Sequence, residues 1–242
     1  MQKLKENKTE EADYITLEFD LLFKKVFGEK EDLKPIKYLL KNILDIEPKK
    51  IEILNTELIG RPYKDKKIYV DLVVELEDGT KVSVEINTNT SQKYIDRNVY
   101  YMCRNISKDL KPNDVYKNLN KHIQINMDFK VSHEKPIMKY ELIEKETLKK
   151  LTDIIEIIRI DIPYYKNKCY NKKVSELDSL TKLLGLFGTK KIELARVLCE
   201  GDKNMEDIMS RIEKYNDDED VIGAYDYEAK MKLIAEIEKE EA

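Results

Sequence analysis

Hydrophobic and polar positions follow two different rhythms along this chain of 242 residues. Apolar residues recur at helical spacing over residues 15–27, 33–46 and 91–110, which predicts three helices in the first half. Gly28 and Pro48 end the first two of these stretches. After Val174 the helical rhythm continues to the end of the chain. This half of the pattern predicts helices at the start, one long helix in the middle and a helical tail.

Between the predicted helices, apolar and polar residues alternate with the period of two that is typical of strands. Such stretches cover residues 49–59, 68–77, 80–87 and 122–129, and residues 138–143 and 153–162 are further strand candidates. Helix, strands, helix, strands and a helical tail together predict an α/β core with a C-terminal helical appendage. We expect a flexible N-terminus over 1–12, a core over 13–170 and a helical region over 171–242.

The stretch IYVDLVVELEDGTKVSVEINTN, residues 68–89, predicts a β-hairpin in which acids stand among valines. Each of the two predicted strands has one apolar face. The two apolar faces lie against the same core only if the strands pair in a register that a three-residue loop produces. A three-residue loop commonly ends in a left-handed residue, and glycine takes that conformation without strain. We therefore expect a bulged hairpin that contains Gly79 and pairs Glu77 with Lys81.

This register has a chemical consequence for Asp71, Glu85 and Asn87, because it places all three on one face. Asp71 would then lie opposite Asn87 and diagonal to Glu85, with Cβ atoms ~5 Å and ~7 Å apart. Two carboxylates at this separation can share a divalent cation, and hard oxygen ligands favour Mg²⁺ or Mn²⁺. The alternative is a sheet with one face in water, on which such acids are merely solvated.

Charge and composition narrow the classes of protein. The formal net charge of −4 argues against attraction of the whole molecule to nucleic acid, but it allows a local basic groove. Three separated cysteines, no CxxC pair and only two histidines exclude a structural zinc site and indicate a reducing cytoplasm. No apolar run approaches the ~18 residues of a membrane span, so we expect no membrane association.

Three segments occur in a recognisable order: FDLLFKKVFG, then VDLVVELEDGTKVSVEIN, then RNVYYMCRNIS. Together they resemble the PD-(D/E)XK nuclease family transposases, also called recombination-promoting nucleases. The resemblance implies a restriction-endonuclease-like α/β sandwich around a mixed sheet, with a metal-dependent endonuclease site. It implies that Asp71 and Glu85 are the metal ligands. The position two after the glutamate is Lys in the broad superfamily and usually Gln in this branch, and here it is Asn87.

The resemblance also suggests residues that contact the substrate. Lys24 and Lys25 in FKKVFG are candidates for phosphate contact. On the helix predicted over 91–110, Arg97 and Tyr100 belong to a basic stripe with Lys93, Arg104 and Lys108, as binding of a phosphate backbone requires. The alternative is a solvated face balanced by nearby aspartates. Glu57 is a possible additional acid, or an ordinary glutamate at a strand end.

Two functions of different class follow. The first is a Mg²⁺-dependent DNA endonuclease of low sequence specificity, in which Mn²⁺ can substitute. In it Asp71 and Glu85 bind the metal, Asn87 positions water or a ligand, and Lys24 and Arg97 contact phosphate. The second is a catalytically inactive nuclease-fold protein that acts as a DNA- or protein-binding module, which the Asn at position 87 would suit. A further hypothesis makes the helical tail a homodimer contact that brings two sites to opposite DNA strands.

Overall fold

The computed structural model describes residues 11–54, 57–58, 68–69, 72–88, 91–110, 113–130 and 133–240, without the side chains at 57–58, 68–69, 232, 236, 239 and 240. Its α-helices are α1 (Asp20–Phe27), α2 (Lys34–Leu44), α3 (Gln92–Ile106), α4 (Ile162–Asn171), α5 (Ser179–Gly188), α6 (Ile192–Cys199), α7 (Lys203–Asn216) and α8 (Glu219–Glu240), with short 3-10 turns η1 (Tyr116–Asn118) and η2 (Val174–Glu176). Its strands are β1 (Ile51–Ile53), β2 (Glu57–Leu58), β3 (Ile68–Tyr69), β4 (Leu72–Leu76), β5 (Lys81–Asn87), β6 (His122–Asp128), β7 (Ile137–Glu141) and β8 (Ile155–Asp161).

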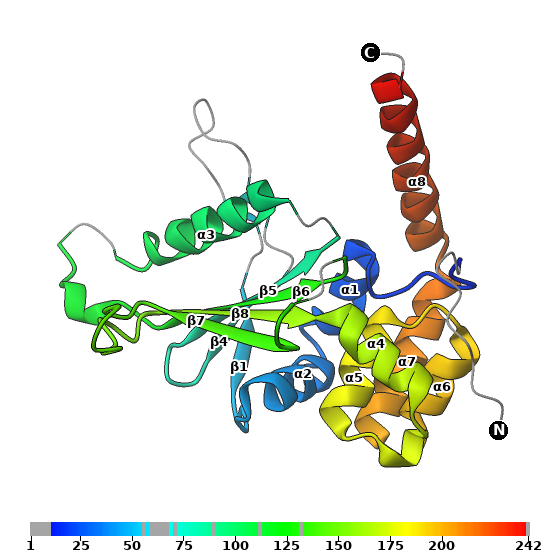
Figure 1. Ribbon diagram of the computed structural model, residues 1–242, viewed down its shortest axis with the longest axis horizontal. Coiled ribbons are helices and arrows are strands. Elements are labelled where there is room, and N and C mark those ends of the chain that lie inside the picture. Colours follow the sequence, from blue (N-terminus) through cyan, green and yellow to red (C-terminus); the bar gives the residue numbers. More distant parts are fainter. Residues whose placement is uncertain are drawn as a thin grey trace.

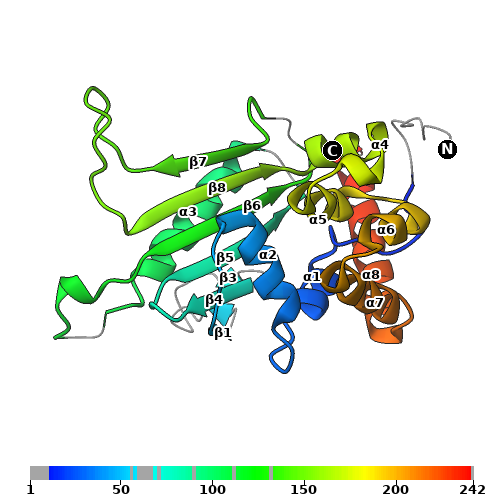
Figure 2. The ribbon, with the colours of Figure 1, turned by 90° about the horizontal axis from the view of Figure 1, so that it is seen from below.

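In the described part of the chain, six strands form one mixed sheet in the order β1-β4-β5-β6-β8-β7. The central strands β5, β6 and β8 are parallel, and the strands outside them are antiparallel to their neighbours. Helix α3 lies over one face and α2 over the other, while α1 and α4–α8 gather beyond the carboxyl ends of the parallel strands (Figures 1 and 2). The predicted α/β fold with a mixed sheet and a C-terminal helical region is confirmed.

The main hydrophobic core lies on the face of the sheet that is turned away from α3. Apolar residues of β4, β5, β6 and β8 point into it, and they pack with α1, α2 and the C-terminal helices in one continuous cluster. Phe27 of α1 stacks on Phe187 of α5 with ring centroids 5.6 Å apart, and Phe23 lies 6.2 Å from the same ring. The helical region after residue 170 is therefore packed directly on the first helix.

Local sequence explains where several helices begin. Pro35 occupies the first turn of α2, where its missing N–H costs nothing. Asp161 accepts a hydrogen bond from the backbone N–H of Tyr164 over 2.8 Å and so caps α4. The prediction continued the last strand through Ile162 and missed α4, because the cap and Pro163 follow a strand without a break. Asp178 and Asp202 cap α5 and α7 in the same way.

Other predicted element boundaries were also wrong. The first helix begins at Asp20 instead of residue 15, because Asn216 holds the preceding chain: its side chain bonds both the N–H and the C=O of Ile15. The strand predicted over 49–59 is interrupted after Ile53, and residues 57–58 pair with β3 in a separate two-stranded sheet.

The β4–β5 hairpin confirms the predicted loop type and corrects its register. Leu76 bonds Thr80 across a three-residue loop, and Gly79 takes a left-handed conformation with φ of 82° at its last position. Glu75, and not Glu77, pairs with Lys81, so the strands are offset by two residues from the prediction. A shift of two preserves which side chains share a face, because side chains alternate with a period of two.

No helix in the described ranges combines the length and the apolar character that a membrane span requires.

Candidate functional site

Polar side chains gather on the face of the sheet that lies beneath α3. The buried members are Ser83, Glu85 and Asn87 of β5 and His122, Gln124, Asn126 and Asp128 of β6. The alternative of a solvated face is wrong for this part of the sheet, since Glu85 is only 2% exposed. Buried polar groups are costly unless they are hydrogen-bonded, so this face is a candidate for function.

A polar cleft of about 250 Å³ opens at the carboxyl end of β5. Four carboxylates and two cations line it: Glu18, Asp20, Glu85, Glu228, Lys24 and Arg97. They come from distant parts of the sequence, namely the segment before α1, α1 itself, β5, α3 and α8. The cleft therefore unites acids that could bind a cation with bases that could bind an anion.

The guanidinium of Arg97 is held by the aromatic side chains of α3. It lies 4.5 Å from the ring centroid of Tyr94 and 5.5 Å from that of Tyr101. Its Nε and Nη2 atoms each donate to Oδ1 of Asn98 over 3.4 Å. Cation–π contacts orient a planar guanidinium without neutralising it. Arg97 thus presents a positioned positive charge to the cleft.

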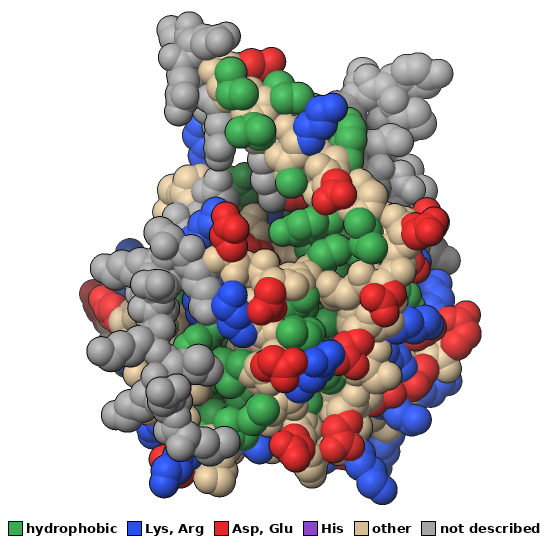
Figure 3. Space-filling view, turned by 90° about the vertical axis from the view of Figure 1, so that its right-hand side faces the viewer, with side chains coloured by type: hydrophobic (Ala, Val, Ile, Leu, Met, Phe, Trp, Pro, Cys, Tyr) green, Lys and Arg blue, Asp and Glu red, His purple; other side chains and the backbone are tan. Residues whose placement is uncertain are grey.

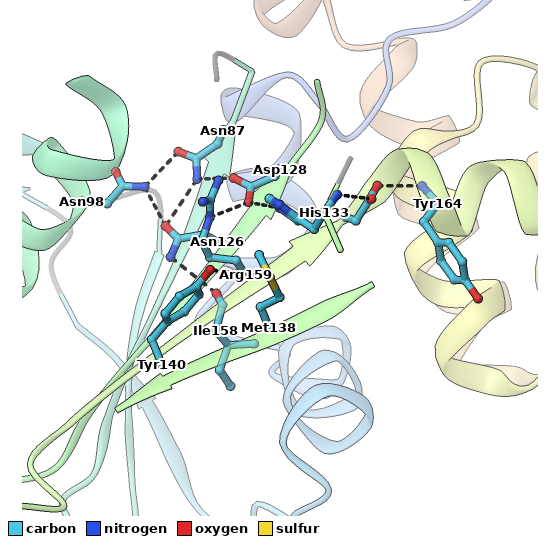
Figure 4. A network of polar contacts seen from close by, with 11 residues as sticks. Asn87, Asn98, Asn126, Asp128, His133, Met138, Tyr140, Ile158, Arg159 and Tyr164 are labelled. Carbon is cyan, nitrogen blue, oxygen red and sulfur yellow. Dashed lines mark hydrogen bonds and ion pairs between the residues drawn. The ribbon is translucent and has the colours of Figure 1, made fainter. Parts of the chain in front are cut away.

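Asn87 lies beside the cleft in a buried network of side chains (Figure 4). Its Nδ2 donates to Asp128 over 3.0 Å and to Asn126 over 3.3 Å. Its Oδ1 accepts from Asn98 of α3 over 3.1 Å, and Asn98 also donates to Asn126 over 2.7 Å. Both amide hydrogens of Asn87 are therefore engaged, and the network ties α3 to β5 and β6.

The same network extends along the ends of the parallel strands. Oδ2 of Asp128 is 2.8 Å from Nε2 of His133 and accepts from Nε of Arg159 over 2.9 Å. Asp161 accepts from the backbone N–H of His133 over 2.9 Å and caps α4 (Figure 4). Sequence reasoning missed Asn98, Asp128, His133 and Arg159. The available signal was the polar alternation of HIQINMD, which by itself predicts only a strand.

The other predicted site residues are placed as follows. Tyr100 is 51% exposed on α3 and lines neither the cleft nor the network. Lys25 lies over the ring of Tyr215 at 5.6 Å, so it faces α7 and not the cleft. Asp71 lies outside the described residues, and so does the side chain of Glu57 in β2.

The donor set in the cleft suits a hard cation. Carboxylate oxygens are the ligands that Mg²⁺ and Mn²⁺ prefer, and Glu85 places one carboxylate in the wall beside Glu18 and Asp20. Within the part of the chain that the structure describes, no three His, Cys, Asp or Glu side chains converge closely enough to hold a metal ion. The carboxylate of Glu85 therefore fits as one ligand of such a cation.

Comparison with known protein families gives a match over most of the chain. The family model described as PD-(D/E)XK nuclease family transposase matches residues 17–242, which is nearly the whole chain. No curated protein and no solved structure matches. The mixed six-stranded sheet with helices on both faces is consistent with the restriction-endonuclease-like α/β fold of such nucleases. The cleft and the network are built from segments inside the matched range.

Proposed function

This chain belongs to the PD-(D/E)XK nuclease family transposases, and we propose that it is a metal-dependent endonuclease that hydrolyses phosphodiester bonds in DNA with low sequence specificity. One observation supports this most strongly: Lys24 of α1, Glu85 of β5 and Arg97 of α3 line the same cleft. These residues come from the three separate sequence segments that resemble the family. Their meeting brings a carboxylate and two cations together, as binding of both a metal ion and a phosphate requires.

We assign the metal to Asp71 and Glu85, with Mg²⁺ as the ion and Mn²⁺ as a substitute. Leu72 pairs with Val84 in the hairpin; in the sequence Asp71 directly precedes Leu72 and Glu85 directly follows Val84. Glu57 is a candidate for an additional acid. A bound Mg²⁺ would stabilise negative charge on the phosphate and lower the pKa of an attacking water.

The remaining residues serve to bind and orient the substrate. Lys24 and Arg97 contact a phosphate of the cleaved strand, because both present positive charge in the cleft. Tyr100 and Lys93, which are both exposed on α3, contact the strand beyond the cleft. Asn87 positions the end of β5, and thereby Glu85, through its bonds to Asp128 and Asn98.

Nicking of a supercoiled plasmid tests the proposal. We expect nicking in Mg²⁺ and Mn²⁺, none in EDTA, and loss of nicking in Asp71→Ala and Glu85→Gln. Glu52→Gln is the matched control, because Glu52 is an exposed acid on β1, outside the cleft. Nicking that persists in both site variants would assign the activity to another site or to a contaminant.

A second function has a specific observation in its favour. Asn87 stands where the superfamily has a lysine, and its amide is engaged in the network instead of facing the cleft. The chain could therefore have kept the fold as a DNA- or protein-binding module. In that case DNA binding survives the Asp71→Ala and Glu85→Gln substitutions, and no metal supports nicking.

We also propose a cytoplasmic homodimer in which α8 contacts a second copy of the chain, so that two sites reach opposite DNA strands. The far half of α8 exposes Met231, Leu233, Ile234 and Ile237 (Figure 3). Light scattering of the double variant Leu233→Glu/Ile237→Glu tests this contact. A molecular mass equal to that of the wild-type chain would contradict the proposed contact.

A further inference from the structure

Among its described residues, helix α8 packs on the body near its start. Val221 is fully buried, and the ring of Tyr225 meets that of Phe19 edge-on at 5.3 Å. Beyond this contact the helix rises away from the molecule (Figures 1 and 3). Of the residues in α8 whose side chains are described, those that face the body therefore lie in its first three turns.

Glu228 is the unusual member of this attached side. It follows Val221 and Ala224 at helical spacing, on the same side of α8, and it is half-buried. An apolar residue is expected on the side of a helix that packs against a core. Glu228 instead lines the cleft that holds Glu85, Lys24 and Arg97, and it also lines the adjoining hollow beside Glu18 and Tyr225. The last helix thus adds a negative charge to the candidate site.

The charges of the described cleft do not favour a phosphate. Four carboxylates and two cations give a formal charge of −2, and Glu228 supplies one of the negative charges. A DNA phosphate that approaches Lys24 and Arg97 meets this excess at short range, where charges interact most strongly. One divalent cation would cancel the excess. Without the charge of Glu228, the excess in the absence of a cation would be half as large.

We propose that Glu228 makes DNA binding at this cleft conditional on a bound divalent cation. This inference rests on the proposed function in one respect, namely that the ligand of the cleft is a DNA phosphate. It adds that α8 is part of the site and that its carboxylate prevents binding of DNA before the cation. The role is electrostatic, so an amide of the same shape removes it.

Fluorescence anisotropy of a labelled DNA duplex measures the effect without requiring cleavage. The wild-type chain, Glu228→Gln and Glu228→Ala are each titrated in EDTA and in Ca²⁺, a hard cation that prefers oxygen ligands. We expect wild-type binding to be at least about tenfold weaker in EDTA than in Ca²⁺. The ratio of the dissociation constant in EDTA to that in Ca²⁺ should be about five- to tenfold smaller in both variants, because they bind DNA more tightly in EDTA.

The matched control is Glu238→Gln, which makes the same change of charge on the exposed far part of α8, outside the cleft. Its ratio should equal that of the wild type, and a narrowed ratio would mean that net charge alone is responsible. An unchanged ratio in both Glu228 variants would overturn the proposal. So would weaker binding of the variants in Ca²⁺, which would make Glu228 a ligand of the cation, and so would the absence of DNA binding in both conditions.

A parallel nicking assay separates this inference from the proposed function. If the ratio shifts as expected and no metal supports nicking, Glu228 controls DNA binding in a chain that does not hydrolyse DNA. If nicking occurs and the ratio of dissociation constants is unchanged in the variants, the proposed endonuclease activity is supported and the proposed role of Glu228 is contradicted.

Discussion

The side-chain amide of Asn87 donates a hydrogen bond to the carboxylate of Asp128 over 3.0 Å, and this bond joins the last residues of two neighbouring parallel strands. A second bond, from Asn98 to Asn87, attaches α3 to the same point. Beneath the candidate site, Asn87 therefore links β5, β6 and α3 in one hydrogen-bonded polar layer.

Replacing Asn87 with alanine should destabilise the chain, because buried polar groups of Asp128, Asn126 and Asn98 would each lose a partner. We expect a loss of about 1–3 kcal/mol in the free energy of unfolding, measured by urea denaturation. The control is Asn171→Ala, since Asn171 is exposed and its side-chain amide donates to the carbonyl of Asn167 in the same helix. It should change the stability by less than about 0.5 kcal/mol. Equal effects would show that the network contributes little.

Lys24 should be the lysine that matters for nicking, because it lines the cleft together with Glu85 and Arg97. Removing a positioned positive charge from such a site typically costs ~10²- to 10³-fold in rate. We therefore expect Lys24→Ala to reduce plasmid nicking by about this factor. Lys25→Ala should leave the rate within about threefold, because Lys25 lies over Tyr215. A larger loss of nicking in Lys25→Ala would show that the assignment of the phosphate contact to Lys24 is wrong.

The sequence was sufficient to predict the α/β order, the three-residue loop and the residues that share a face in the hairpin. The alternation of side chains could not separate the pairing of Glu77 with Lys81 from that of Glu75 with Lys81, because both registers keep it intact. The preference of glycine for the last position of the loop does separate them, and it favours the observed register because Gly79 occupies that position.

The site residues that the sequence did not predict depend on contacts between distant segments. Asn98 and Asn126 are 28 residues apart and meet only because α3 covers the sheet. Polar alternation in β6 looks the same whether its polar side faces water or a helix. Glu228 was missed for a related reason, since one glutamate in a charged tail gives no sign of the cleft it faces.

Two left-handed glycines should respond differently to alanine. Gly79 and Gly201 have φ of 82° and 81°, so each alanine variant should lose about 1–2 kcal/mol from backbone strain. A Cβ at Gly79 would also lie 2.8 Å from Oδ1 of Asn120, whereas one at Gly201 would have nothing within 4 Å. Gly79→Ala should therefore be the less stable variant in thermal unfolding. Adding Asn120→Ala should bring the two variants level.

The stability of the chain should depend on pH through His122. Burial lowers the pKa of His122 below its ordinary value of 6.5, although its contact with Asp109 opposes this effect. The unfolded chain therefore takes up the proton first as the pH falls. The stability that His122 contributes is complete above pH 6.5 and is lost progressively below it.

For Asp109, burial alone would raise the pKa, but hydrogen bonds from Lys81 and His122 lower it below 3.8, so its contribution is lost only at more acid pH. Replacing His122 with Gln should flatten the dependence of unfolding free energy on pH between about pH 7 and 5, measured by urea denaturation at each pH. A slope equal to that of the wild type would show that other groups control this range.

The helical region after residue 170 should be inseparable from the first helix. Phe187 packs against Phe23 and Phe27, and all three rings are buried in the main core. Phe187→Ala should cost about 3–5 kcal/mol in urea denaturation, and Phe187→Leu should cost clearly less. Residues 13–170 alone would expose the same surface of α1, so we expect them to show no cooperative unfolding transition. A cooperative transition in that fragment would make residues 13–170 an independent domain, because its core would then form without the aromatic contact to α5.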